Sequence, residues 1–282
     1  MPEFDARGTV NGHTQQNTRQ IRLVATDLDG TLLRSDQSIS PRTRQTLARV
    51  VSSGIPVALV TGRPPRFVVD LASDLGLTGS AICANGAICY DMASQQLLEH
   101  HPMTSDTAAE IAGALAEALP GAVFAVERGL EYGCEPGYLA LGVIAQDQGH
   151  IVADALTLCA QPITKLLARH PSYTSSQLHA LAEPVVGPRA QVTFSGPHMI
   201  EISALGIDKA AALARLSARL GVDQDNVIAF GDMPNDAAML RWAGLGVAVA
   251  NAHTEALAAA DEVTGSNMDD GVAMVLERYF PL

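Results

Sequence analysis

The sequence has 282 residues, 48% hydrophobic and 17% charged, a globular composition long enough for one large domain or two smaller ones. Its formal net charge of −12 and the lack of a basic run argue against nucleic acid as a partner, because no positive field attracts a phosphate backbone. No apolar run reaches the roughly 20 residues of a membrane span, and the polar start of the chain lacks the apolar segment of a signal peptide.

A regular alternation of strands and helices follows a polar stretch, residues 1–20, that is predicted to be a disordered tail. Residues 21–27 ("IRLVATD") and 55–62 ("IPVALVTG") are predicted strands, each apolar enough to be covered on both faces. Between them, residues 40–54 are predicted to form a helix, because Ser40 suits the N-cap position and a proline follows it.

The next segment continues this alternation. Residues 63–77 are predicted to form a second helix, and residues 80–91 ("SAICANGAICYD") a third strand that returns through an Asn-Gly turn into a fourth. Successive strand–helix–strand units predict a parallel sheet with right-handed crossovers, which is an α/β fold.

The pattern changes over residues 88–190. A helix is predicted over 104–121 and a short strand over 122–127, followed by a glycine-rich stretch, 128–138, and by further helical and strand-like segments. This mixture predicts an α+β insert rather than more of the parallel sheet.

Buried strands and helices alternate again in the last third of the chain. Asp208 is expected to cap a helix that begins at Lys209, and residues 226–232 ("NVIAFGD") are predicted to be another buried strand. We therefore assign residues 21–87 and 191–282 to one core domain and the insert to a second domain.

Acidic side chains follow two of the predicted strands. Asp27 and Asp29 end the first strand two residues apart and so point the same way, while Asp232 and Asp236 follow the later strand. If the two strands are neighbours, four carboxylates meet at the edge where open α/β sheets bind ligands. Two unit charges about 4 Å apart repel by about 4 kcal/mol at an effective dielectric of about 20, so the cluster needs a counter-charge. An all-oxygen site suits Mg²⁺ better than zinc.

Other polar residues occupy less specific positions. Thr61 ends the second predicted strand and Gly62 would let the backbone approach a ligand, although Thr61 alone also fits an ordinary strand residue. Lys209 opens a helix, where the helix dipole disfavours a cation, so an anion is expected nearby. Lys209 is one of only two lysines in the chain, and the other is Lys165. Taken singly, each acidic residue also fits a turn or a helix cap.

The cysteines provide no sign of a metal or disulfide framework. They have neither CxxC spacing nor a paired histidine cluster, which argues against zinc. We expect small buried thiols in a reducing, cytoplasmic compartment. The four residues are Cys83, Cys89, Cys134 and Cys159.

Four motifs in order carry a family resemblance: "DLDGTLL" (27–33), "LVTGR" (59–63), the lysine of "GIDKAAAL" (206–213) and "GDMPNDAAML" (231–240). In this order and spacing they resemble the haloacid dehalogenase (HAD)-like hydrolases, and "ANGA" (84–87) with the insert behind it resembles the Cof-type sugar-phosphatase branch. The resemblance runs from about residue 21 to the end of the chain. It implies a HAD-like Rossmannoid three-layer core with a parallel sheet, plus an inserted α+β cap domain.

The resemblance also implies a role for each motif residue. Asp27 would be the nucleophile that becomes an aspartyl-phosphate, and Asp29 the general acid and then the base that activates water. The groups that would hold Mg²⁺ are the Asp27 carboxylate, the Asp29 backbone carbonyl, Asp232 and, in the outer shell, Asp236. The residues that would hold the phosphoryl oxygens are Thr61, Gly62, Lys209 and Asn235.

The insert would be a cap that closes over the site, expels water and contacts the substrate. Its candidates for substrate contacts are Arg128, Tyr132 and Glu135 in the glycine-rich stretch. The implied function is a Mg²⁺-dependent phosphatase acting on a small phosphorylated metabolite, in particular a sugar phosphate. A phosphotransferase or phosphomutase on the same scaffold and a non-catalytic phosphate-binding protein are the alternatives. The sequence has no heptad seam from which an oligomeric state could be predicted.

Overall fold

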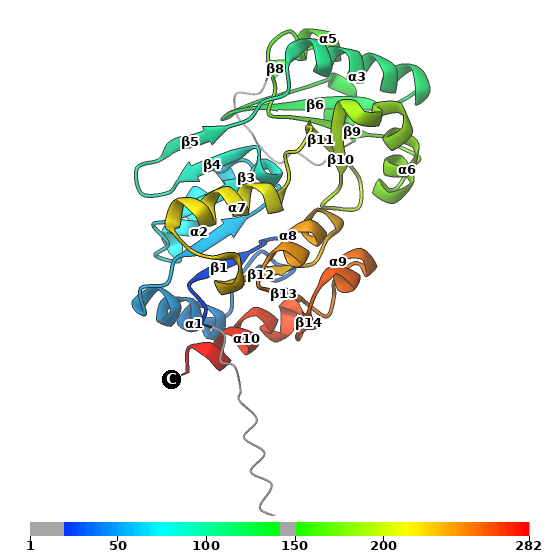
Figure 1. The fold of residues 1–282 in the computed structure, drawn as a ribbon. Coiled ribbons are helices and arrows are strands. Elements are labelled where there is room, and N and C mark those ends of the chain that lie inside the picture. The colour runs from blue at the N-terminus through cyan, green and yellow to red at the C-terminus, as the bar shows by residue number, and fades with distance from the viewer. Residues whose placement is uncertain (1–19, 142–150, 282) are drawn as a thin grey trace, which may run out of the picture.

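The structure, a computed structural model, describes residues 20–141 and 151–281, so the predicted tail over residues 1–20 lies almost entirely outside the described residues. The described chain forms two sheets of eight and six strands, one stacked above the other (Figure 1). No helix in these two ranges is both long and apolar enough to cross a membrane.

The larger sheet belongs to the core domain. Its strands are β1 (Leu23–Thr26), β2 (Val57–Val60), β3 (Ser80–Cys83), β4 (Ile88–Asp91), β5 (Gln96–His100), β12 (Val227–Gly231), β13 (Leu245–Ala248) and β14 (Glu262–Val263). Their order is β14-β13-β12-β1-β2-β3-β4-β5. The first six strands are parallel to one another, β4 pairs antiparallel with β3, and β5 pairs antiparallel with β4. The predicted parallel sheet is confirmed, and β1 lies at its centre beside β12.

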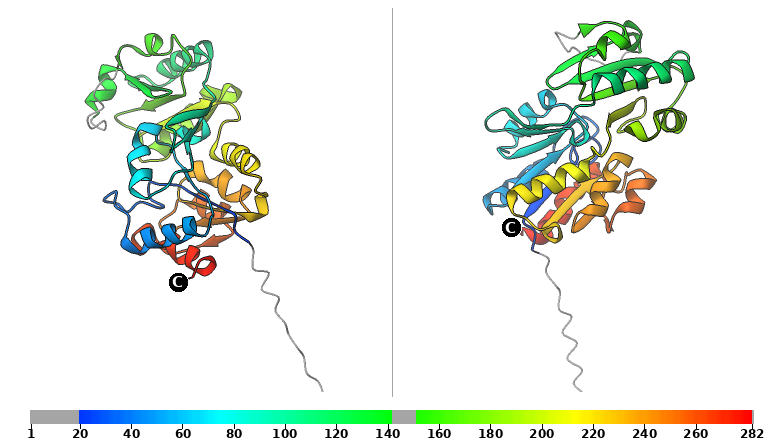
Figure 2. Two further views of the ribbon diagram at one scale, coloured as in Figure 1. Left: turned by 90° about the vertical axis from the view of Figure 1, so that its left-hand side faces the viewer. Right: turned by 45° about the horizontal axis from the view of Figure 1, so that its top comes forward.

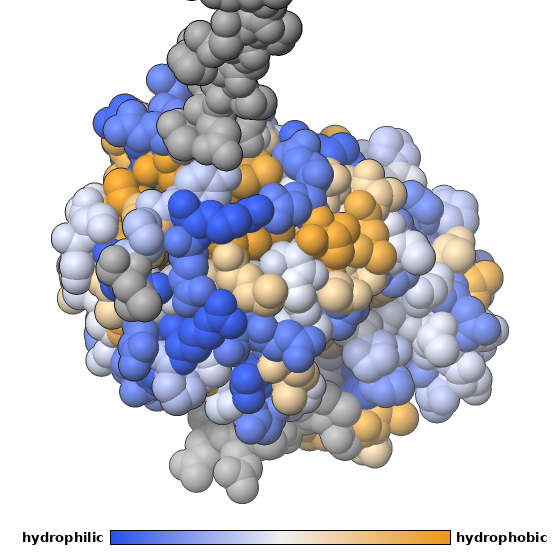
Figure 3. Space-filling view, turned by 90° about the horizontal axis from the view of Figure 1, so that it is seen from below, coloured by the Kyte–Doolittle hydropathy of each residue, from blue (hydrophilic) through white to orange (hydrophobic). Residues whose placement is uncertain are grey.

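Helices cover both faces of this sheet (Figure 1). One face packs against α1 (Pro41–Ser52), α2 (Val69–Asp74) and α10 (Gly271–Tyr279), and the other against α7 (Lys209–Leu220), α8 (Ala237–Trp242) and α9 (Thr254–Ala259). Successive residues of β1 alternate between the two layers: Leu23 and Ala25 pack with the second set of helices and Val24 with the first. This three-layer arrangement confirms the predicted fold class. The end of the molecule beyond α1 and α10 is largely polar, with smaller apolar areas between (Figure 3).

The two predicted helices after β1 and β2 have different outcomes. α1 is confirmed, with the Ser40 hydroxyl accepting a hydrogen bond from the backbone N–H of Thr43 at 3.0 Å. The helix predicted over 63–77 is wrong in its extent, because a 3₁₀ turn over Pro65–Phe67 precedes the short α2. Helical backbone angles are disfavoured for the residue before a proline, so Pro64 and Pro65 delay the start of α2.

The smaller sheet belongs to the insert. Its strands are β6 (Val123–Arg128), β7 (Glu131–Cys134), β8 (Ile151–Val152), β9 (Lys165–Arg169), β10 (Ala190–Thr193) and β11 (Ile200–Ala204), in the order β10-β11-β9-β6-β7-β8. One face packs against α3 (Ser105–Ala118), α5 (Ala155–Leu158) and α6 (Ser175–Val186), whereas α4 (Pro136–Ala140) lies against the other. The predicted α+β insert is confirmed.

The boundaries predicted for the insert, 88 and 190, do not match the sheets. β4 and β5 pair with β3 in the larger sheet, whereas β10 and β11 pair with β9 in the smaller one. A hairpin extends the sheet that one of its two strands joins, and that pairing is not visible in local alternation. Sheet membership therefore favours boundaries near residues 101 and 205.

The face of the smaller sheet that carries α4 lies over the core domain, which two further views also show (Figure 2). Direct contacts join the two parts. Lys165 of β9 donates a hydrogen bond to the backbone oxygen of Gly62 at 2.8 Å, and Asn85 after β3 donates one to Glu201 of β11 at 2.5 Å. The insert is therefore a roof over the edge where the acidic motif residues were expected.

Candidate active site

The acidic residues converge because their strands are neighbours. β1 pairs in parallel with β12, Thr26 beside Phe230, and Asp27 and Asp232 come directly after these strands. Lys209 opens α7, and its ammonium nitrogen lies 2.6 Å from an oxygen of Asp27 and 2.6 Å from an oxygen of Asp236. The expectation that an anion faces Lys209 is confirmed.

The cluster carries more negative than positive charge. Asp27, Asp232 and Asp236 are buried, and their carboxylate oxygens can lie within 4.8 Å of one another, with one ammonium beside them. Burial raises the pKa of Asp27 well above its usual value, Lys209 opposes this, and the two other carboxylates add to it. Burial also raises the pKa of Asp232 to about 7, with repulsion from Asp236 as the next cause. A divalent cation would remove this excess charge.

The donor set fits a hard divalent cation such as Mg²⁺. Thr31 donates a hydrogen bond to Asp232 at 2.7 Å and so orients its carboxylate. Both oxygens of Asp236 are already engaged, one by Lys209 and the other by the backbone N–H groups of Asp232 and Met233 at 3.0 and 2.9 Å. Asp27 and Asp232 are therefore the better direct ligands, and Asp236 suits an outer-shell position.

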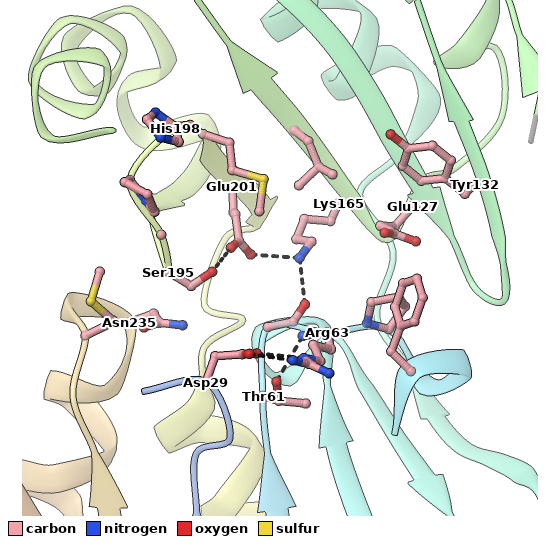
Figure 4. A pocket seen from close by; sticks show the side chains of 18 of the residues that line it. Asp29, Thr61, Arg63, Glu127, Tyr132, Lys165, Ser195, His198, Glu201 and Asn235 are labelled. Atoms are coloured by element: carbon pink, nitrogen blue, oxygen red, sulfur yellow. Dashed lines mark hydrogen bonds and ion pairs between the residues drawn. The ribbon is translucent and has the colours of Figure 1, made fainter. Parts of the chain in front are cut away.

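Asp29 does not join this cluster. Its carboxylate accepts two hydrogen bonds from the Arg63 guanidinium, at 2.7 and 2.5 Å, and lines the pocket below the roof (Figure 4). The four carboxylates expected from the sequence are thus a cluster of three with a fourth nearby. The TGR arginine was not assigned a role from the sequence, although it directly follows the predicted phosphate residues.

The residues expected to hold phosphate lie on adjacent loops. Thr61 is buried at the end of β2, and its backbone oxygen accepts a hydrogen bond from the N–H of Asn85 at 3.0 Å. The Asn235 amide donates to the Asn85 side chain at 3.0 Å, and its own oxygen has no hydrogen-bond partner among the described residues. Thr61, Gly62 and Asn235 line one pocket with Asp27, and Lys209 contacts Asp27 from behind.

This pocket has a volume of about 800 Å³ and lies between the core and the roof. Figure 4 shows Tyr132, Glu127, Lys165 and Glu201 on the roof side, facing Asp29, Thr61 and Asn235 on the core side. This volume is within the range that is typical of small-molecule sites in proteins. The roof residues that line it are Glu127, Tyr132, Tyr138, Lys165, Leu167, Arg169, Ser195, Gly196, Pro197, His198, Met199 and Glu201.

Of the three substrate contacts expected in the glycine-rich stretch, only Tyr132 lines this pocket. Arg128 donates a hydrogen bond to the backbone oxygen of Leu158 at 2.7 Å. Glu135 accepts hydrogen bonds from the backbone N–H groups of Phe124 and Ala155 at 2.8 and 3.1 Å. Arg128 and Glu135 thus hold the backbone of the insert, and the structure gives no support for their contact with a substrate.

The roof contains a buried ion pair, Lys165–Glu201, that was not predicted from the sequence. Lys165 lies 2.7 Å from Glu201, which also accepts hydrogen bonds from Ser195 and Asn85. Burial by itself would raise the pKa of Glu201, but the charge of Lys165 and these hydrogen bonds outweigh it and lower the pKa. The available signal was the scarcity of lysine, since both lysines of the chain lie at this site.

Comparison with known proteins agrees with this geometry. The family model of the haloacid dehalogenase-like hydrolases matches residues 24–276. A 5-amino-6-(5-phospho-D-ribitylamino)uracil phosphatase of Bacillus subtilis is 31% identical over 271 residues, covering 94% of this chain and 98% of the relative. A pyridoxal phosphate phosphatase of Escherichia coli is 28% identical over 280 residues, with coverages of 92% and 98%. A solved HAD subclass IIB sugar phosphatase has a TM-score of 0.81 at 19% identity, with coverages of 92% and 98%, which shows the shared fold.

These matches span both the core and the insert, and the two sequence relatives are phosphatases. The family that the four sequence motifs predicted is confirmed. The chain belongs to the haloacid dehalogenase-like hydrolases.

Proposed function

We propose that this chain is a Mg²⁺-dependent phosphatase that hydrolyses a small phosphorylated metabolite through an aspartyl-phosphate on Asp27. The observation that supports it best is the position of the Asp27 carboxylate, which is held by Lys209 beside two further carboxylates and lines a pocket of about 800 Å³. The sequence relatives are phosphatases of small phosphorylated metabolites, and the family generally uses Mg²⁺ and an aspartyl-phosphate.

The reaction would take place in two displacements at phosphorus. An Asp27 oxygen attacks the phosphorus, the bond to the leaving oxygen breaks, and Asp29 gives that oxygen a proton. Asp29 then takes a proton from water, whose oxygen attacks the aspartyl-phosphate, so that inorganic phosphate leaves and Asp27 is restored. Arg63 donates hydrogen bonds to both oxygens of Asp29 in this structure, so Asp29 must release at least one of them before it can give a proton to the leaving oxygen.

Charge stabilisation would come from the groups around the transferring phosphoryl. Lys209 lies beside the nucleophile, and the hydroxyl of Thr61, the backbone N–H of Gly62 and the amide of Asn235 would hold the phosphoryl oxygens. Mg²⁺, when bound by the Asp27 and Asp232 carboxylates and the Asp29 backbone carbonyl, would supply further positive charge there.

Replacement of the nucleophile tests the mechanism. Asp27→Asn should abolish release of inorganic phosphate from p-nitrophenyl phosphate with Mg²⁺ present, while the circular dichroism spectrum stays that of the wild type. Release without any added acceptor alcohol would separate the phosphatase from a phosphotransferase. Turnover by Asp27→Asn at the wild-type rate would refute the covalent route.

A cytoplasmic location and a small metabolite as the binding partner are part of the same proposal. The four cysteines are buried and free, which suits the reducing cytoplasm. The net charge of −12 disfavours nucleic acid, so the expected partner is the metabolite alone.

A further inference from the structure

The charges that line the pocket are paired, with one exception. Four lysine and arginine side chains line it, namely Arg63, Arg66, Lys165 and Arg169. Three of them have a carboxylate partner, in the pairs Arg63–Asp29, Arg66–Glu127 and Lys165–Glu201. Arg169 has no such partner in the part of the chain that the structure describes.

Arg169 is nonetheless held firmly in place. It is 5% exposed, its Nε–H donates a hydrogen bond to the backbone oxygen of His198 at 3.2 Å, and its guanidinium carbon lies 5.4 Å from the centre of the Tyr138 ring. Its Nη1 is buried with no hydrogen-bond partner among the described residues. A buried cationic group without a carboxylate partner is costly, and a ligand in the pocket that Arg169 lines can supply an acceptor to its guanidinium.

The strand β9 sets where this donor lies. Lys165, Leu167 and Arg169 alternate with residues that pack under the helices, so all three face the pocket. Lys165 contacts the phosphate-side loop through the backbone oxygen of Gly62. Four residues of strand span about 13 Å, which places the backbone of Arg169 at the end remote from that loop.

The surface between these two ends is apolar. Leu167, Tyr132 and Tyr138 form one buried cluster on the pocket face of the smaller sheet. A sugar with hydroxyls all round would leave its polar groups against this surface without partners. The middle of the pocket therefore suits a flat or apolar group.

We propose that Arg169 is a carboxylate-binding residue, and that the preferred substrate is a phosphate monoester whose alcohol has a flat or apolar middle and a carboxylate at its far end. The proposal rests on the phosphatase function proposed above. A carboxylate carries the single negative charge that matches one unpaired guanidinium, whereas a second phosphate carries more charge than this end can balance.

Matched substrates that differ only in charge test this proposal. The first pair is 4-carboxyphenyl phosphate and 4-carbamoylphenyl phosphate, and a longer pair is 3-(4-phosphonooxyphenyl)propanoate and its amide. For at least one pair, the wild type should have a KM about tenfold lower for the carboxylate, as expected for a charged hydrogen bond. Arg169→Met should abolish this preference and Arg169→Lys should restore part of it.

Arg189→Met is the matched control, because Arg189 lies in the same domain and, among the described residues, donates hydrogen bonds only to the backbone oxygens of Val185 and Val186. It should keep the wild-type preference. Equal preferences in wild type and Arg169→Met for both pairs would overturn the carboxylate subsite.

Calorimetry separates this proposal from the phosphatase function itself. Binding of the same compounds to Asp27→Asn, with and without Arg169→Met, should show the same charge preference in Kd without turnover. A binding preference without hydrolysis by the wild type would refute the phosphatase and keep the subsite. Hydrolysis without any charge preference in KM or Kd would refute the carboxylate subsite and keep the phosphatase function.

Discussion

Gly30 lies directly against the proposed metal ligand Asp232. Its φ is +84°, and a Cβ built on it would be 2.4 Å from a carboxylate oxygen of Asp232. A side chain at this position must therefore displace that oxygen, besides straining the backbone. The glycine of the first motif is required by this close approach, which explains its place immediately after Asp29.

Gly30→Ala should lower the affinity for Mg²⁺ by about 10–100-fold, as the loss of ligand orientation does at metal sites. The measurement is the Mg²⁺ concentration that gives half-maximal phosphatase activity. Gly54→Ala is the control, because Gly54 has a φ of +76° with nothing within 4 Å of its built Cβ. Equal Mg²⁺ requirements in Gly30→Ala and the wild type would argue against Asp232 as a ligand.

The convergence of Asp27 and Asp232 could be predicted from the sequence, because a strand end and its direction determine where the following side chain lies. Asp27 and Asp232 follow continuous apolar runs, and parallel strands end at the same edge. The position of Asp29 was only partly predictable, since Arg63 draws its carboxylate into the pocket. That ion pair depends on side-chain rotamers, which the alternation of a strand does not determine.

At the scale of elements, the ion pair Lys165–Glu201 joins β9 to β11 and is 3% and 1% exposed. Removal of one partner leaves an uncompensated buried charge, which costs about 3–5 kcal/mol, whereas apolar replacement of both can be nearly neutral. Lys165→Met and Glu201→Leu should therefore each lower the free energy of unfolding by more than the double variant does.

Urea unfolding of the single and double variants measures this difference. The control is Arg44→Met, because the pair Arg44–Asp74 is 40% and 60% exposed and should contribute less than about 1 kcal/mol. Additive losses in the double variant would show that Lys165 and Glu201 do not stabilise the fold as a pair.

Elements were predictable where the signals are local. α1 and α7 begin where their cap residues are, since Ser40 and Asp208 each accept a hydrogen bond from the backbone three residues on. The ends of the insert were not predictable in this way. Whether β4 and β10 join the larger or the smaller sheet is decided by pairing across the fold, which the local sequence does not determine.

At the scale of the whole molecule, Glu277 of α10 ties the C-terminal helix to α1. It lies 2.6 Å from Arg42 and 3.5 Å from Arg49 and accepts a hydrogen bond from Thr46 at 3.1 Å. The hydrogen bond from Arg42 is the main cause that lowers the pKa of Glu277 from 4.5 to about 2. A carboxyl pKa lowered by folding stabilises the protein above pH 4.5, and this stability is lost as the pH falls toward 2.

Glu277→Gln should therefore lower the free energy of unfolding at pH 7, by at most about 1 kcal/mol for a partly exposed pair. The difference from the wild type should shrink as the pH falls from 4.5 toward 3. Urea unfolding at several pH values measures it, and a difference that is constant from pH 7 to pH 3 would rule out the ion pair as its cause.

The pocket as a whole could not be read from the sequence. Glu127, Lys165 and Glu201 come from three strands, and they become neighbours only through the pairing of β6 and β11 with β9. Their separations along the chain are long, so no periodicity connects them. The catalytic side of the site was accessible through motifs within single loops, and the substrate side needed the assembled roof.

Both lysines of the chain are buried, at 1% and 3% exposure. The folded protein therefore offers an amine-reactive reagent no lysine on its surface. Lys165 of the roof contacts the backbone oxygen of Gly62 in the core, so labelling of Lys165 reports that the roof has separated from the core.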